Sequence, residues 1–263
     1  MSENKNEGKG ITLPTEVQKP RAVNARTMVL YGLPKSGKTT AISKLKNCLI
    51  VDVEDGAAFT EGMIVAPPKG GPVSKFKWLK ELAAEIRKQG HPYDYVAIDT
   101  LSQLDTDAEW VGTWNYMNSV QGKKFNREKD EVTPLKPSDP NYESVLSLAN
   151  GYGYRYTREA ILDIFDELKD LGKICTIFVC HVADKMVAKK GSTDEVMIKD
   201  LALVGKTRDI IPRVTDAIGN VWNEDGVLKV SFVGDSQKVG GIRAKHLLGY
   251  TGTLEWDSIF IKE

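Results

Sequence analysis

The chain has 263 residues, 41% of them hydrophobic and 27% charged, which is enough for one large domain with a core. Its 36 basic and 36 acidic residues cancel, which excludes a polycationic nucleic-acid binder, so any nucleic-acid surface has to be a local patch. No apolar stretch reaches the ~18 residues needed to cross a bilayer, and the polar N-terminus lacks an export-signal core, so we expect a cytoplasmic protein without membrane contact.

The N-terminal residues 1–25 are rich in Lys, Glu, Asn, Gly and Pro and are predicted to form a flexible arm. The rest of the chain, residues 26–263, is predicted to be one domain. It opens with a strand at Thr27–Tyr31, and a helix is expected from Gly37 to about Lys46. A second apolar strand follows at Cys48–Val53.

Helix and strand periodicities then alternate along the chain. A helix is predicted from an N-cap at Ser74 to Gly90, and a strand at Tyr93–Asp99. A further helix ends at Gly172, before a strand at Ile174–His181. Because these strands are almost continuously apolar and alternate with helices, we predict an α/β fold with a mostly parallel central sheet flanked by helices.

The C-terminal part has a different pattern. Two strand-like runs, Val214–Val221 and Val227–Val233, are separated by the turn sequence Asn223–Gly226, which predicts an antiparallel hairpin on the sheet edge. Two other stretches, residues 102–157 and 182–209, are long and polar. We expect them to be functional loops or insertions, because long irregular segments in a compact domain usually have a function.

A phosphate-binding motif follows the first strand. All fixed positions of G-x-x-x-x-G-K-T are filled by Gly32, Leu33, Pro34, Lys35, Ser36, Gly37, Lys38 and Thr39, and Thr40 comes next. The glycines allow successive backbone N–H groups to converge on an anion. Lys38 can reach the β- and γ-phosphates, and Thr39 can bind Mg²⁺. The strand before the motif and the helix after it are the context that a P-loop requires, so we predict binding of ATP with Mg²⁺.

Carboxylates follow two of the predicted strands. Asp99 ends the third strand and is expected to face the ligand crevice at the strand ends, where it can hold Mg²⁺ through water. Glu54 follows the second strand and is predicted to be the base that orients the attacking water. Asp52 and Asp55 are competitors for that role, and a surface turn also explains this segment. His181 ends the fourth strand, where it either contacts the γ-phosphate or merely caps the strand.

In this order, GLPKSGKTT, IVDVEDGA, YVAIDTLSQL and TIFVCH resemble the RecA-like ATPase core over residues 27–235. The resemblance implies that Glu54 is the catalytic carboxylate and that His181 senses the γ-phosphate. More narrowly, the PKSGKTT, VEDG, GYGYRYTRE and GKTRDIIPRVTD stretches are similar to phage nucleotide-binding proteins, including RecA-like single-strand annealing proteins that work beside a single-strand DNA-binding protein. This implies a homo-oligomer, either a filament or a ring, in the host cytoplasm.

Related ATPases often carry a late Lys or Arg finger that reaches the nucleotide of a neighbouring subunit. Arg243 and Lys245 in GGIRAKHLLG are the candidates here, although the spacing departs from that of the relatives.

DNA-contacting loops in RecA-like proteins follow the third and fourth strands, which are the two long stretches found above. The candidate contacts with single-stranded DNA are Lys123, Lys124, Arg127, Lys189, Lys190, Lys206 and Arg208. The alternative is a solvated loop, because acidic residues dilute this charge and Tyr152–Tyr156 could pack beneath the following helix.

The sequence therefore predicts a DNA-dependent ATPase that acts in recombination or strand annealing. The alternatives are a nucleotide-gated binding module with little turnover, a small helicase or packaging motor, and a small-molecule kinase.

Overall fold

The computed structural model describes residues 13, 15–20, 22–126, 139–188 and 195–261. Its α-helices are α1 (Lys38–Ile42), α2 (Pro72–Lys88), α3 (Leu101–Met117), α4 (Gly153–Leu168), α5 (Thr207–Val214) and α6 (Trp256–Ile259). Its strands are β1 (Thr27–Gly32), β2 (Cys48–Asp52), β3 (Met63–Val65), β4 (Tyr95–Asp99), β5 (Cys175–Ala188), β6 (Glu195–Leu201), β7 (Ala217–Glu224), β8 (Val227–Ser231), β9 (Gly241–Ile242) and β10 (Thr251–Thr253). No helix among these residues is both long enough and apolar enough to cross a bilayer.

The strands form a single sheet in the order β10-β8-β7-β1-β5-β4-β2-β3. The pairs from β7 to β3 are parallel, whereas β8 and β10 add antiparallel pairs at one end. The predicted α/β class with a mostly parallel sheet is confirmed. Register brings the carboxyl ends of the central strands together, since Gly32 pairs with His181 and Asp52 pairs with Asp99.

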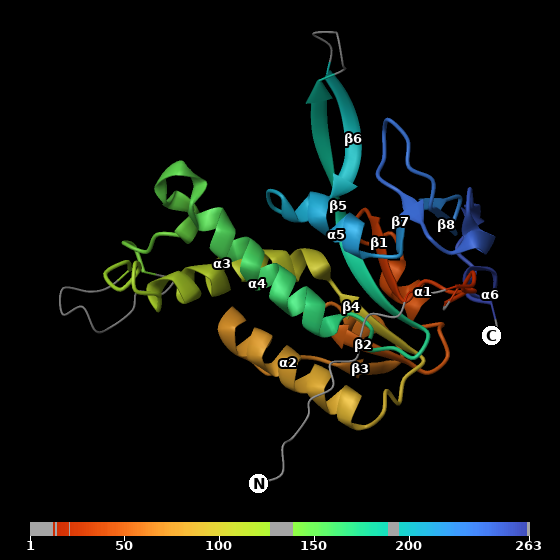
Figure 1. Ribbon diagram of the computed structural model, residues 1–263, viewed down its shortest axis with the longest axis horizontal. Coiled ribbons are helices and arrows are strands. Elements are labelled where there is room, and N and C mark those ends of the chain that lie inside the picture. The colour runs from red at the N-terminus through yellow and green to blue at the C-terminus, as the bar shows by residue number, and fades with distance from the viewer. Residues whose placement is uncertain (1–12, 14, 21, 127–138, 189–194, 262–263) are drawn as a thin grey trace.

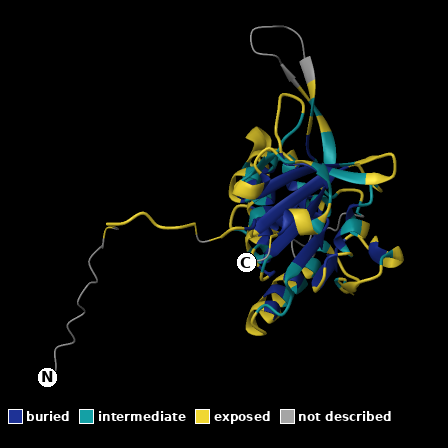
Figure 2. Cartoon of the chain, turned by 90° about the vertical axis from the view of Figure 1, so that its right-hand side faces the viewer, coloured by how far each residue is buried: buried dark blue, intermediate teal, exposed yellow. Residues whose placement is uncertain are grey.

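Two apolar clusters cover the two faces of the sheet, because its strands are buried on both sides. One cluster joins the strands to α2, α3 and α4 (Figure 1) through side chains such as Leu79, Leu104 and Ile161. The other face is covered by the short helices α1 and α6, with Ile42 and Ile259 buried. The strands of the sheet consist mostly of buried residues (Figure 2). Residues 15–20 extend away from the domain.

Several element boundaries differ from those predicted. Helix α1 ends at Ile42 rather than Lys46, because the next hydrogen bonds, from the amides of Lys44 and Leu45, span only three residues. Helix α2 begins at Pro72, so Gly71 and not Ser74 is its N-cap; proline is well suited to the first helical turn.

The two stretches predicted to be long loops, 102–157 and 182–209, contain regular elements among their described residues. The first contains most of α3 and the start of α4, and Thr100 caps α3 by accepting a hydrogen bond from the amide of Gln103. The second contains the end of β5 together with β6, which form an antiparallel hairpin that projects from the body (Figure 1).

The C-terminal hairpin is present, but it does not form the sheet edge. Its first strand, β7, begins at Ala217 rather than Val214 and lies beside β1, and β10 covers the second strand. The tight turn between them places Asp225 and Gly226 at positive φ, as a two-residue hairpin loop requires.

Candidate functional site

The phosphate-binding motif forms a compact loop between β1 and α1. Gly37 has φ of 97°, a conformation that favours glycine. Gly32 has no space for a side chain, because a Cβ there would lie 2.2 Å from the carbonyl oxygen of Val221 on β7. Both fixed glycines are therefore explained by the backbone path, while Leu33, Pro34 and Lys35 are exposed on the outside of the loop.

Lys38 folds back over this loop. Its ammonium donates hydrogen bonds to the carbonyl oxygens of Gly32 (3.1 Å) and Leu33 (2.7 Å) and to the hydroxyl of Ser36 (3.4 Å). Burial lowers the pKa of Lys38, and the negative charge of Asp99 opposes that shift. The structure therefore holds a preorganised cation on the loop that is expected to receive the phosphates.

Thr39 and Asp99 meet at the carboxyl end of β4. The Thr39 hydroxyl donates to Asp99 Oδ2 at 2.5 Å, and Asp99 is 8% exposed. Burial raises the pKa of Asp99, the Thr39 hydrogen bond lowers it, and the nearby Glu54 and Asp52 raise it. A hydroxyl beside carboxylates suits a hard cation such as Mg²⁺, which retains several waters. These residues fit Mg²⁺, which would neutralise phosphate charge when bound.

Glu54 lies in a turn just beyond β2, and its carboxylate has two side-chain partners. The Thr100 hydroxyl donates to Glu54 Oε1, and His181 Nε2 lies 3.2 Å from the same oxygen. The carboxylate is 30% exposed, so it is held in place and still accessible to solvent. This combination is what a base that orients a water molecule requires.

The two competing aspartates have different surroundings. Asp52 accepts hydrogen bonds from the amides of Gly56 (3.1 Å) and Ala57 (2.8 Å), so both of its oxygens close the turn. Asp55 is exposed and has φ of 60°. Geometry therefore favours Glu54 over Asp52 and Asp55 as the water-orienting group.

His181 connects the turn of Glu54 to β5. Its backbone amide donates to the Ser102 hydroxyl at 2.9 Å, which fixes the end of the core part of β5 to α3. The ring contacts Glu54 through Nε2, while Nδ1 is buried without a hydrogen-bond partner in the described part of the chain. His181 is thus the first residue of the projecting segment and also touches the predicted base.

A second layer, which the sequence analysis missed, supports the Glu54 turn. Lys75 on α2 donates to the carbonyl oxygen of Val53 (3.1 Å) and to Asp107 Oδ2 on α3 (2.6 Å). Gln103 donates to the other oxygen of Asp107 at 2.9 Å. No local spacing indicates this arrangement, because Lys75 and Asp107 are 32 positions apart.

A large cavity of about 1480 Å³ adjoins the loop on the α1 side of the sheet. Ser36, Gly37 and Thr40 form its wall at the loop, and Leu228 and Trp256 lie among its other lining residues. The Trp256 indole N–H donates to the carbonyl oxygen of Ala41 at 2.7 Å, which attaches this lining to α1. The cavity is large enough for a nucleoside attached to phosphates on the loop.

The other predicted residues lie away from this cluster. Arg243 forms an ion pair with Asp216 at 3.0 Å. Asp216 lies just before β7, which runs parallel to β1, so this pair is at the opposite end of the sheet from the loop. Lys245 is exposed two residues further along the chain. Whether either of them reaches the nucleotide of another subunit stays a prediction.

Of the predicted DNA contacts, the structure describes four. Lys123 and Lys124 are exposed beyond α3, and Lys206 is exposed at the start of α5, where Arg208 is half-buried. Arg127, Lys189 and Lys190 lie outside the described residues. Tyr152 and Tyr156 pack edge-on against Tyr116 and each other, which agrees with the packing alternative for these aromatic residues.

A comparison with protein families agrees with the chemistry of the loop. The family model described as "AAA domain" matches residues 24–243. Among curated protein sequences there is no match.

Among solved structures, the chain is similar to a prototypical ATPase from the type III secretion system of pathogenic bacteria, with 11% identity and a TM-score of 0.40. The similarity covers 74% of this chain and 52% of that one, so the chain spans about half the length of that ATPase. Because the family model covers most of the sequence, including the loop, Asp99 and Glu54, the chain belongs to the AAA domain family of P-loop ATPases, which bind and hydrolyse nucleoside triphosphates.

Proposed function

We propose that this chain is an Mg-ATP-hydrolysing, RecA-like protein that acts on single-stranded DNA in phage-type recombination or strand annealing. The observation that carries the proposal is the contact between Glu54 and His181, 3.2 Å apart. Glu54 orients the attacking water, Lys38 and Thr39–Asp99 with Mg²⁺ hold the phosphates, and the nucleoside lies in the cavity beside α1.

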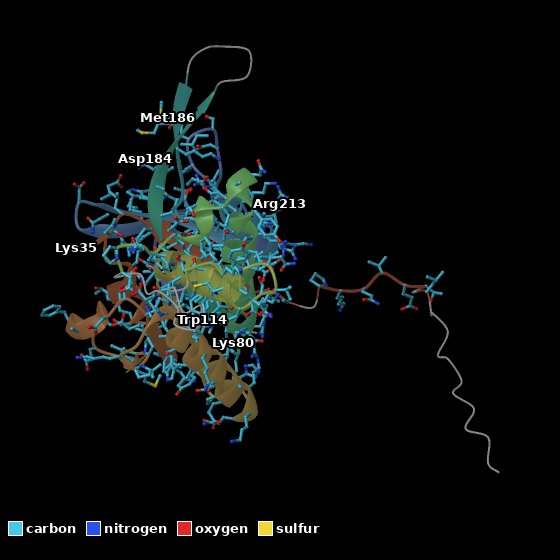
Figure 3. The ribbon with its side chains drawn as sticks, turned by 90° about the vertical axis from the view of Figure 1, so that its left-hand side faces the viewer. Lys35, Lys80, Trp114, Asp184, Met186 and Arg213 are labelled. Atoms are coloured by element: carbon cyan, nitrogen blue, oxygen red, sulfur yellow. The ribbon has the colours of Figure 1, made fainter. Side chains whose placement is uncertain are left out.

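The step from ATP to DNA rests on the segment that His181 begins. The same strand continues into the β5–β6 hairpin, along which Asp184 and Met186 are labelled in Figure 3. Lys185 and Lys199 carry positive charge on its described part, where Asp184 and Asp200 carry the opposite charge and Lys185 pairs with Asp200 at 3.9 Å. Because a γ-phosphate would bear on Glu54 and His181, nucleotide state would alter the base of this hairpin, and the affinity of its lysines for DNA phosphates would change with it.

ATP turnover with and without single-stranded DNA tests this proposal. Lys38→Ala should abolish nucleotide binding. Glu54→Gln should retain binding and lose about 10²- to 10⁴-fold in kcat, the usual contribution of a positioned base. Asp55→Asn is the matched control, since Asp55 is adjacent and exposed, and it should turn over normally.

The outcomes separate the alternatives. Turnover stimulated by single-stranded DNA supports the proposal, as does tighter DNA binding with a non-hydrolysable ATP analogue than without nucleotide. Background turnover under every condition would favour the nucleotide-gated module, and phosphate transfer to an acceptor would favour the kinase. Full turnover by Glu54→Gln would remove Glu54 from the catalytic role.

We further propose that the active form is a homo-oligomer, a filament or a ring, that operates with a single-strand DNA-binding protein. Electron micrographs with ATP and single-stranded DNA would test the assembly. Particles that remain monomeric under these conditions would argue against it and against a trans-acting role for Arg243 or Lys245.

A further inference from the structure

A second hollow, of about 680 Å³, lies between β7, the base of the β5–β6 hairpin and the segment that follows β8. Its volume is within the usual range for small-molecule sites. It shares no lining residue with the phosphate loop or the large cavity. Its polar and aromatic lining comprises Lys199, Asn220, Trp222, Asp235, Gln237 and Lys238.

Backbone hydrogen bonds fix the walls of this hollow. The backbone carbonyl oxygen of Lys199 on β6 accepts a hydrogen bond from the amide of Val239 at 3.1 Å. The amide of Lys199 donates to the carbonyl oxygen of Gln237 at 2.7 Å. Asp235 accepts the amides of Gln237 (2.7 Å) and Lys238 (3.0 Å), which closes the turn. The site is therefore built on β6, β7 and one braced turn, which positions side chains more precisely than a free loop would.

Two side chains of β7 face the hollow because residues two apart point to the same side of a strand. Asn220 is only 7% exposed, yet its carboxamide makes no hydrogen bond within the described residues. Its polar atoms are not fully enclosed by the protein, and the side chain lines the hollow, so the carboxamide is accessible from it. A ligand with donors and acceptors would supply the hydrogen bonds that this carboxamide does not make within the described part of the protein.

Trp222 supplies an aromatic surface, and two lysines supply charge. Lys238 Nζ lies 5.8 Å from the Trp222 ring centroid and also donates to the Ser231 hydroxyl at 3.2 Å. In the described part of the chain, neither Lys199 nor Lys238 forms an ion pair, and the Trp222 indole N–H has no hydrogen-bond partner. An aromatic ring, an amide and two lysines thus surround one hollow, and their positive charge exceeds the single negative charge of Asp235.

We propose that this hollow binds a nucleotide unit, with the base against Trp222, its polar edge at Asn220 and its phosphate near Lys199 and Lys238. Each part of a nucleotide matches one of these groups, since bases stack on aromatic rings and phosphates attract ammonium groups. The unit could come from a single strand or from a free nucleotide. We favour the strand, so this inference rests on the proposed function and adds a contact absent from the predicted set.

The location gives the site a route to the ATPase centre. Trp222 directly follows Val221, which pairs with Gly32 at the start of the phosphate loop. Lys199 lies on the strand that pairs with the hairpin part of β5, beyond His181. A bound nucleotide unit would therefore contact β7 beside the residue that pairs with Gly32, and β6 opposite Asp184, three residues beyond His181.

Binding of fluorescein-labelled dT15, in the presence of a non-hydrolysable ATP analogue, tests the site by anisotropy. Trp222→Ala should weaken binding by about 5- to 150-fold, the range for loss of one stacked base. Trp222→Phe should restore most of it, and Lys238→Gln should weaken binding and reduce its salt dependence. Trp114→Ala on α3 is the matched control, and unchanged ATP binding verifies that each variant is folded.

A second arm uses dTMP with the Lys38→Ala chain, whose phosphate loop is disabled. If dT15 binds and Trp222→Ala binds it equally well, the site is overturned while the proposed function stands. If the unsubstituted chain fails to bind dT15, the proposed function is overturned. The site then stands if dTMP binds in a Trp222-dependent manner, with a free nucleotide as its source, and falls if dTMP does not bind.

Discussion

Replacing Asp105 with asparagine should change how the stability of the protein depends on pH. Asp105 is buried on α3, and its Oδ2 accepts the amide of Val204 at 2.6 Å, while Oδ1 is enclosed without a partner among the described residues. Burial raises the pKa of Asp105 to about 6; the Val204 hydrogen bond and Arg208 oppose the shift, and Glu109 adds to it. An asparagine can retain the Val204 hydrogen bond without carrying a charge.

The magnitude follows from the difference between the pKa values of the folded and unfolded states. In the unfolded chain an aspartate has a pKa of about 3.9, so below pH 3.9 both states are protonated and Asp105 contributes nothing. As pH rises through both values, the buried carboxylate destabilises the fold by about 1.5 kcal/mol at pH 5 and about 3 kcal/mol at pH 8. Relative to the unsubstituted chain, Asp105→Asn should therefore gain about 1.5 kcal/mol between these pH values.

Urea unfolding at pH 5, 6, 7 and 8 measures this difference, because subtracting the two proteins cancels every other titrating group. Asp225→Asn in the β7–β8 turn is the control, because this aspartate is exposed and forms no ion pair among the described residues, and we expect a flat difference from the unsubstituted chain. If Asp105→Asn gives the same flat difference, burial does not destabilise the ionised Asp105, and the reasoning fails.

Two further predictions concern the frame of the site. Gly32→Ala should destabilise the fold by about 3 kcal/mol, because the new Cβ would overlap a β7 carbonyl; Gly56→Ala, which meets no atom within 4 Å, should be almost neutral in thermal unfolding. Lys75→Met should cost about 3–5 kcal/mol by leaving Asp107 buried and uncompensated, whereas Lys75→Met with Asp107→Leu should recover most of that stability. Equal losses in the single and double variants, measured by urea unfolding, would contradict this account of the pair.

The parts of the fold that could be predicted from sequence are those with a local chemical cause. The phosphate loop is fixed by its glycines and by the strand before it, and strands such as β4 are almost wholly apolar. Helix α3 was missed because its buried positions include Asp105, Asp107 and Thr113, so its pattern looks polar. Buried polar residues therefore hide a helix from an analysis of hydrophobic periodicity.

Some residues of the candidate site could also be predicted from the sequence, and others could not. Lys38, Thr39 and Asp99 could be placed from motif spacing, because strand ends in a parallel sheet share one edge. The distinction between Glu54 and Asp52 could not, since it depends on which oxygens the turn at Gly56 and Ala57 occupies. The hollow at Trp222 was not predictable either, because its lining comes from three segments joined only by tertiary pairing.

The uninterrupted course of β5 has a mechanical consequence. One strand begins in the core at Cys175, passes His181 beside Glu54 and ends in the projecting hairpin at Ala188. A paired strand resists bending far more than a loop, and the seven residues beyond His181 extend about 23 Å. A rotation of the hairpin by about 10° at His181 would displace its far end by about 4 Å, because displacement grows with distance from the point of rotation.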